Sequence, residues 1–202
     1  MRKDGLATKE RILDAAHKLV LAFGYGGTTV DEVIEAAGIT KGAFFHHFKS
    51  KEALARELVT RYVKTDCNLL DEIIHFAEQK TSDPVQQLLA IVGRYIELLE
   101  VDPHPEGCLY ASFCYESGLM EEDTLKPVQE AVLYWRRRMT EKISAAIHHR
   151  PPRVAVDASG LADYFLSTFE GGFVLARTLK QPQIIVEQLK QFRTFLAALF
   201  NN

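Results

Sequence analysis

Several features that define large protein classes are scarce or missing in this chain. It has only three cysteines, an odd number without a C-x-x-C pair, so a disulfide framework is not expected. No uninterrupted apolar run approaches the roughly 20 residues that span a bilayer. The basic start Met1–Gly5 is not followed by the apolar core of a signal peptide. We therefore expect a cytoplasmic protein with reduced thiols and no membrane partner.

The motifs of common enzyme classes are also missing. We find no Ser-His-Asp arrangement, no glycine-rich phosphate loop and no paired metal motif. Glu72-x-x-His75 has the spacing of half a di-iron ligand set, but no second copy accompanies it. We expect no enzymatic activity, no metal and no cofactor. An enzyme built on a helical bundle and a helical adaptor that binds only protein remain the competing hypotheses.

Composition is that of a globular protein, with 47% hydrophobic and 25% charged residues among 202. The net charge of −3 is unevenly distributed. Residues 1–51 hold eight basic and six acidic residues, whereas the remaining 151 hold 16 basic and 21 acidic ones. A mildly basic head on an acidic body allows one end to face phosphates. Arg2 and Lys3 are either a basic arm that reaches a minor groove or a solvated tail.

Apolar residues recur at helical spacing almost throughout, and no convincing strand alternation is present. The pattern predicts an all-α fold. Glycines, prolines and capping residues divide it into helices. The expected helices cover about 8–23, 29–37, 40–48, a long segment from 50, 84–101, 108–118, 124–149, 154–180 and 182–200.

Residues 29–48 have the geometry of a helix-turn-helix. Thr29 and Glu32 form a capping box, Gly38 suits a left-handed turn, and Ile39 can fill the angle between the helices. In such a motif the N-terminal residues of the second helix meet base edges in the major groove. Its small three-helix core is expected to contain four apolar side chains, Phe23, Val33, Phe44 and Phe48.

From Thr8 to Leu54 the chain closely resembles the TetR family of regulators. The resemblance is carried by five segments: 11–16 (RILDAA), 23–25 (FGY), 28–30 (TTV), 34–39 (IEAAGI) and 41–54 (KGAFFHHFKSKEAL). This chain departs from the family at Phe45 and His47, where tyrosine is usual. A histidine at position 47 can still donate a hydrogen bond to phosphate, although it loses the reach of a phenol.

The resemblance implies a homodimeric repressor that binds double-stranded operator DNA. It implies a helix-turn-helix domain over residues 1–50 and a helical ligand-binding and dimerisation domain over 51–202. A small-molecule effector in the second domain would change the spacing of the two DNA-binding heads. The expected DNA-binding residues are Thr28, Thr29, Thr40, Lys41, Gly42, Ala43, Phe45, His46, His47 and Lys51.

An effector cavity needs an aromatic or apolar lining with a few polar groups. The C-terminal part diverges within the family, so the resemblance identifies no effector. The expected ligand-binding residues are Cys108, Tyr110, Phe113, Glu116, Trp135 and Phe169. A redox role for Cys108 is an alternative.

The last two expected helices are the best candidates for a dimer interface. Each has an apolar stripe, and Gly172 allows close helix approach. Two such pairs around a two-fold axis would form a four-helix interface. The alternative is that both stripes face the core of their own chain. The expected dimerisation residues are Leu161, Phe165, Gly172, Leu175, Leu189, Phe192 and Leu196.

Overall fold

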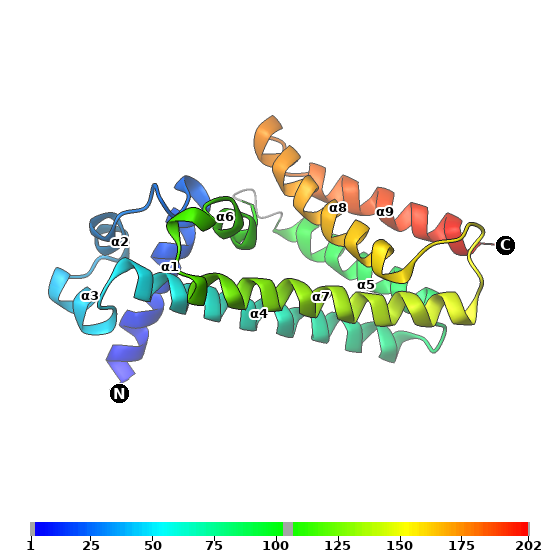
Figure 1. The fold of residues 1–202 in the computed structure, drawn as a ribbon, viewed down its shortest axis with the longest axis horizontal. Helices are drawn as coiled ribbons and strands as arrows, with labels where there is room; N and C mark the ends of the chain where they lie inside the picture. Colours follow the sequence, from blue (N-terminus) through cyan, green and yellow to red (C-terminus); the bar gives the residue numbers. More distant parts are fainter. Residues whose placement is uncertain (1–2, 103–106, 202) are drawn as a thin grey trace. The chain divides into compact units, whose positions relative to one another are not determined.

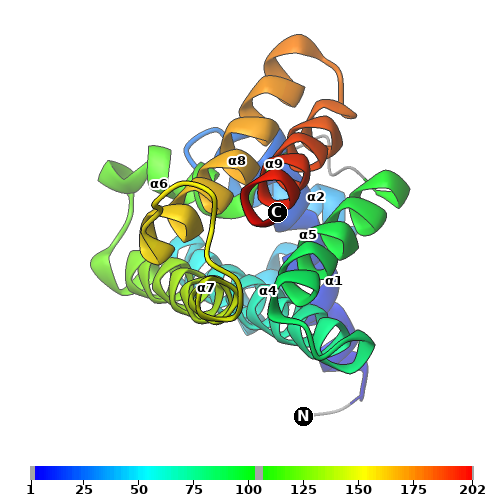
Figure 2. The same cartoon turned by 90° about the vertical axis from the view of Figure 1, so that its right-hand side faces the viewer.

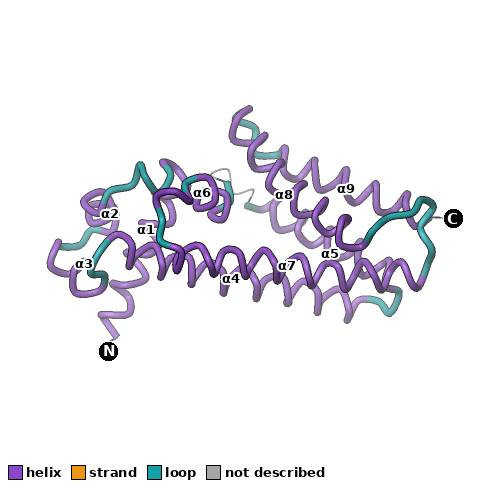
Figure 3. Tube along the Cα trace, in the orientation of Figure 1, coloured by secondary structure: helices purple, strands orange, loops and turns teal. Residues whose placement is uncertain are grey.

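The computed structural model describes residues 3–102 and 107–201, which form helices joined by loops, with no strand among them (Figure 3). The expected all-α class is confirmed. The helices are α1 (Lys3–Phe23), α2 (Val30–Ala37), α3 (Lys41–His47), α4 (Lys51–Lys80), α5 (Pro84–Val101), α6 (Leu109–Tyr115), the 3-10 turn η1 (Ser117–Leu119), α7 (Glu122–His149), α8 (Ala158–Leu179) and α9 (Ile184–Phe200). Arg2 and the side chain of Lys3 lie outside the described residues.

Helix boundaries differ from the expected ones mainly where a different residue provides the cap. Helix α1 begins at Lys3, so Thr8 lies inside it rather than capping it. Helix α8 begins after Asp157, whose carboxylate accepts from the Gly160 amide at 2.7 Å, and not at Val154. Carboxylates are favoured at this position because the first helical amides have no partner within the helix.

The described residues pack as two compact units (Figure 1). The first contains Met1–Thr65 with Cys108–Glu130, and the second contains Asp66–Gly107 with Ala131–Asn202. Helices α4 and α7 therefore contribute residues to both units. These are packing units, and the division of function at residue 50 stays a prediction.

The core of the first unit joins α1, α2 and α3 to the start of α4 and to α6. Val33, Phe44 and Phe48 are buried as expected, at 1%, 0% and 3% exposure. The prediction that Phe23 also belongs to this core is wrong, because its side chain is 65% exposed. The chain turns at Gly24, where φ is +79°, and the next residue, Tyr25, enters the core instead.

The second unit is built from α5, α8, α9 and the later parts of α4 and α7. Helix α9 lies alongside both α8 and α5 (Figure 2). Helices α4 and α7 are joined through Asp71, which accepts from the Tyr134 hydroxyl at 2.5 Å and from Arg138 Nε at 3.0 Å. Lys142 on α7 pairs with Glu78 on α4. This polar seam fixes α4 against α7 beside an apolar core.

Candidate nucleic-acid interface

The turn between α2 and α3 is held by specific hydrogen bonds. Thr29 Oγ1 accepts from the Glu32 amide at 3.2 Å, and Glu32 Oε2 accepts from the Thr29 amide at 2.7 Å. These bonds to Thr29 also hold the pKa of Glu32 below its ordinary value. Gly38 adopts the left-handed conformation at φ 61° and ψ 45°. Arg11 Nη2 donates to the carbonyls of Ala37 (2.5 Å) and Gly38 (3.1 Å), so α1 fastens the end of α2.

Helix α3 is oriented by two buried phenylalanines, Phe44 within it and Phe48 directly after its last residue. Phe44 and Phe48 lie one helical turn apart, with ring centroids separated by 5.9 Å. Thr40 Oγ1 accepts from the Ala43 amide at 3.2 Å and caps the helix. With one face anchored in the core, the first turn of α3 is left facing solvent.

Most of the expected base-reading residues lie on this outward face. Side chains at Thr40, Lys41, Phe45 and His46 are exposed, as is Gly42; Ala43 and His47 are partly exposed. Lys41 Nζ lies 3.3 Å from Asp31 Oδ1, but both side chains are more than two-thirds exposed. Such an exposed pair is weak and is readily exchanged for a phosphate contact.

His46 and His47 end α3 with their ring centroids 5.1 Å apart. The pKa of His47 is lowered by burial first, and then by the neighbouring His46 and Lys9. A lowered pKa keeps the His47 ring neutral at pH 7. The imidazole then provides a single N–H donor until a phosphate raises its pKa.

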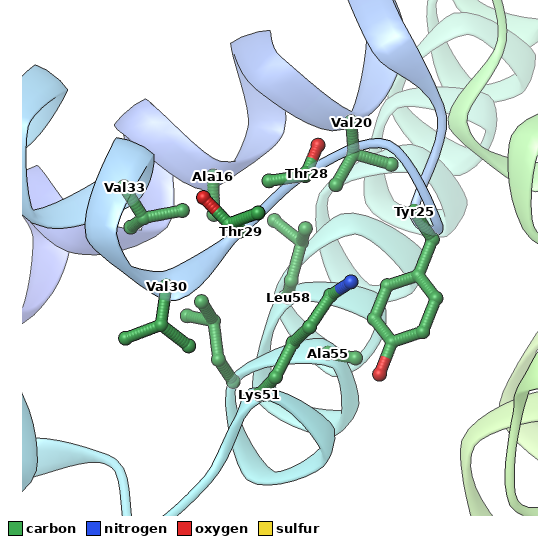
Figure 4. Close-up of a pocket in the computed structure, with 11 residues that line it drawn as sticks. Ala16, Val20, Tyr25, Thr28, Thr29, Val30, Val33, Lys51, Ala55 and Leu58 are labelled. Atoms are coloured by element: carbon green, nitrogen blue, oxygen red, sulfur yellow. The ribbon is translucent and has the colours of Figure 1, made fainter.

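Thr29 and Lys51 meet at a shallow crevice beside the start of α2 (Figure 4). The Lys51 ammonium stands 4.2 Å from the centroid of the Tyr25 ring, a cation–π contact. Thr29 is exposed there, but Thr28 is not. Thr28 is 3% exposed, and its hydroxyl donates to the Gly24 carbonyl at 2.8 Å. We therefore remove Thr28 from the expected DNA contacts and assign it to the turn.

The six expected ligand-binding residues are divided between the two packing units. Cys108, Tyr110, Phe113 and Glu116 belong to the first unit, while Trp135 and Phe169 belong to the second. Phe113 is fully buried in the same core as the DNA-binding helices. The packing of α6 in the head accounts for the burial of Phe113, and the six-residue lining stays a prediction.

Glu116, one of these four, fastens the loop after α1. Its carboxylate accepts from the Gly26 amide at 2.7 Å. A Cβ built on Gly24 would stand 2.2 Å from Glu116 Oε1, so a side chain at this position would have to displace the carboxylate. Cys108, considered above for redox chemistry, is buried immediately before α6.

In the second unit, Trp135 and Phe169 belong to an aromatic cluster with Tyr95, Phe165 and Phe192. Sequence reasoning missed Tyr95 and its polar neighbour Asp66, whose carboxylate accepts from Trp135 Nε1 at 2.7 Å. A signal was present, because Asp66 precedes buried Leu70 and Ile73 by four and seven residues. That spacing places an acid on the apolar face of α4.

The expected dimerisation stripe faces inward. Six of its seven residues are buried within their own chain: Leu161, Phe165, Gly172, Leu189, Phe192 and Leu196. Only Leu175 is exposed, at 44%. A Cβ on Gly172 would stand 2.5 Å from Ile185 Cδ1, so this glycine serves the contact between α8 and α9. The alternative stated above, a stripe that packs in its own core, fits these residues.

Other apolar side chains occupy the outer faces of α8 and α9. Tyr164 and Leu175 on α8 are 49% and 44% exposed, and Phe195 on α9 is 38% exposed. The rings of Tyr164 and Phe195 lie 5.8 Å apart, so the two helices present one continuous apolar surface. Gly171, in the same face of α8, is open to solvent.

Within the described part of the chain, no helix is both long and apolar enough to cross a membrane. In residues 3–102 and 107–201, no group of three His, Cys, Asp or Glu side chains is arranged to hold a metal ion.

Two family models match this chain. The model for bacterial regulatory proteins of the tetR family matches residues 12–58. The model for the tetracyclin repressor-like C-terminal domain matches residues 84–192, more than half of the chain. The first match contains the helix-turn-helix, and the second contains most of the second unit.

Relatives and solved structures give the same result. The chain is 25% identical over 190 residues to the HTH-type transcriptional repressor DhaR of Mycobacterium sp. (strain GP1), covering 92% of this chain and 88% of the relative. A TetR-family regulator from Agrobacterium tumefaciens has a TM-score of 0.80 at 22% identity, covering 98% of this chain and all of that one. A TetR regulator from Chloroflexus aurantiacus has a TM-score of 0.76 at 26% identity, covering 98% and 97%.

Proposed function

Because this chain belongs to the TetR family of bacterial transcriptional regulators, we propose that it represses transcription at a DNA operator and is released by a small organic effector. It acts in the cytoplasm as a homodimer and catalyses no reaction. The observation that carries the DNA-binding role is the exposed first turn of α3 on a helix anchored by Phe44 and Phe48.

Residues at the start of α3 contact the bases. Lys41 and His46 provide hydrogen-bond donors, and Gly42 lets the backbone approach the groove. Phe45, 39% exposed, offers an apolar contact for a thymine methyl group. Helix α3 is too short to cover a whole operator, so one head reads one half-site.

Thr29 and Lys51 contact the phosphates of the DNA backbone. The N-terminus of α2 carries a partial positive charge from the helix dipole, which favours an anion beside Thr29. Lys51 stands at the same crevice and adds a full charge. Phosphate contacts of this kind set the orientation of a head on DNA without selecting its sequence.

The second head comes from a second copy joined through the outer faces of α8 and α9. Tyr164, Leu175 and Phe195 form the apolar centre of this face, and exposed Gly171 allows close helix approach. Two copies related by a two-fold axis bury these residues against each other. The dimer holds its heads about 34–36 Å apart, one turn of DNA.

Fluorescence anisotropy with labelled DNA from the upstream region of the chain's own gene tests this function. The protein should bind this DNA far more tightly than a shuffled sequence of equal length at the same salt concentration. The double variant Lys41→Ala and His46→Ala should lose the preference while keeping the helical circular dichroism spectrum. Equal affinity for both DNAs, with no change in the variant, would contradict reading by α3.

A further inference from the structure

Tyr95 on α5 carries a polar group that the packing of the second unit does not use. Its side chain is 5% exposed, and its hydroxyl oxygen is buried without a hydrogen-bond partner among the residues that the structure describes. Buried hydroxyl groups are nearly always paired, since burial removes their hydrogen bonds to water. A group at this point that can bond to the Tyr95 hydroxyl is therefore expected.

Aromatic rings surround Tyr95. Its ring centroid lies 5.4 Å from that of Trp135 and 5.1 Å from that of Phe169. Trp135 and Phe169 also contact each other, at 6.1 Å. The faces of such rings carry negative partial charge, and they attract organic cations.

Two carboxylates, those of Asp66 and Asp71, act on the Tyr95 hydroxyl. Asp66 lies against Trp135, whose indole N–H donates to it. Asp71 is paired with Arg138. Cys67 adds no charge, since burial raises the pKa of its thiol to about 11. Burial first, and then the neighbouring acids, raise the pKa of Tyr95, so its hydroxyl stays protonated.

We infer that Tyr95, Asp66, Trp135 and Phe169 form the effector site and that it takes an aromatic ammonium ion. The ligand's N–H group bonds to the Tyr95 hydroxyl and pairs with the Asp66 carboxylate. Its aromatic body stacks on Trp135. This assignment rests on the proposed function, which requires an effector without identifying one.

Phe169 is the ring that gives way to the ligand. It is only partly buried, whereas Phe165 behind it is fully buried. Phe169 lies on α8 and contacts Phe173 at 6.3 Å on the same helix. Because α8 also carries the outer apolar face with Leu175, displacement of Phe169 acts on the helix that joins the two copies.

Three probes that share a biphenyl group but differ in charge test whether the site prefers a cation. They are biphenylmethylammonium, biphenylmethanol and biphenylacetate. Trp135 is the only tryptophan in the chain, so its fluorescence reports on this site alone. With calorimetry as a second readout, the cation should bind at least about tenfold more tightly than the alcohol. The acetate should show no binding, because its charge repels Asp66. The cation should also lower the anisotropy of the DNA complex.

Two conservative variants test the residues. Asp66→Asn keeps an oxygen for the Trp135 N–H but removes the charge. It should therefore weaken binding of the cation about tenfold and leave binding of the alcohol unchanged. Tyr95→Phe removes only the buried hydroxyl, so it should weaken the cation without lowering the melting temperature. Asp163→Asn, in an exposed pair with Arg136, and Tyr115→Phe, at an exposed ring, are the matched controls.

The inference is overturned if the three probes bind alike, if none binds, or if Asp66→Asn leaves cation binding unchanged. It is also overturned if Tyr95→Phe lowers the melting temperature and leaves cation binding intact, because an ordered water then satisfies the hydroxyl. Operator binding without probe is measured first on the same protein. If the operator is bound and the probes are not, the proposed function stands and only this effector site fails.

Discussion

The DNA-binding helices and the last two helices distribute their apolar residues differently. Helix α3 places Phe44 in the core and turns Lys41, His46 and one aromatic ring, Phe45, toward solvent. Helix α9 has aromatic residues on two sides, with Phe192 inside the core at 2% exposure and Phe195 outside at 38%. Helix α8 repeats this arrangement.

The difference concerns where apolar side chains can be buried: within a single chain, or only against a partner. Helix α3 buries Phe44 in its own core, and we propose that its exposed residues contact DNA. Helix α9 leaves the apolar ring of Phe195 in water, and the proposed second copy would cover it.

The largest expected effect comes from removing the anchor of α3. Phe44→Ala should destabilise the protein by roughly 3–5 kcal/mol, because it opens a cavity in a small core. Thermal and urea denaturation, followed by circular dichroism, measure the loss. Phe23→Ala is the matched control: with a 65% exposed side chain it should change stability by no more than about 0.5 kcal/mol. Equal losses of stability in the two variants would contradict the burial of Phe44 and the exposure of Phe23.

The next effect tests the outer face of the last two helices. Phe195→Glu should raise the dimer dissociation constant roughly 30-fold or more, because a charge enters the centre of the apolar face. Sedimentation velocity across a dilution series measures it, and the monomers should keep their helical spectrum. Leu133→Glu, at an exposed position on α7, is the control. Phe192→Glu should instead unfold the second unit, since that residue faces its core.

A smaller effect tests the polar face of the head. Lys51→Ala should lower the slope of log affinity against log salt concentration by about 1, on specific and non-specific DNA alike. Anisotropy titrations at several salt concentrations provide the slope. Lys80→Ala, at the end of α4 in the second unit, should leave it unchanged. An unchanged slope for Lys51→Ala would show that its ammonium stays over Tyr25.

The smallest effect is a pH dependence from His47. Its lowered pKa means that the folded protein binds this proton less readily than the unfolded chain does. Its contribution to stability is therefore present above about pH 6.5 and is lost as pH falls through the folded pKa. DNA affinity should change in the opposite direction, rising as pH falls, because protonated His47 attracts phosphate. His47→Gln should flatten both pH profiles, and unaltered profiles would refute a contact by this ring.

The sequence was most informative about the head. The capping box at Thr29, the left-handed turn at Gly38 and the buried pair Phe44 and Phe48 all follow from local rules, and the structure has them. Phe23 was misplaced because it lies in the last turn of α1. There the change of direction at Gly24 decides which neighbouring aromatic residue enters the core.

Composition cannot group residues from distant helices. Phe113 and Trp135 look alike in sequence, yet one packs with the head and the other with Tyr95. An acid on an apolar helix face, as at Asp66, is the sequence signal for the effector site that we propose.

The sequence alone determined the helical class, the helix-turn-helix and the family, because spacing and capping act over a few residues. Only the tertiary structure decided that Phe192 packs inward and Phe195 outward, and that the Tyr95 hydroxyl is buried beside Trp135. Phe192 and Phe195 are the same residue type three positions apart, so the residue type alone does not say which ring faces the core. The choice depends on which face meets α5 and α8, and such contacts join residues far apart in the chain.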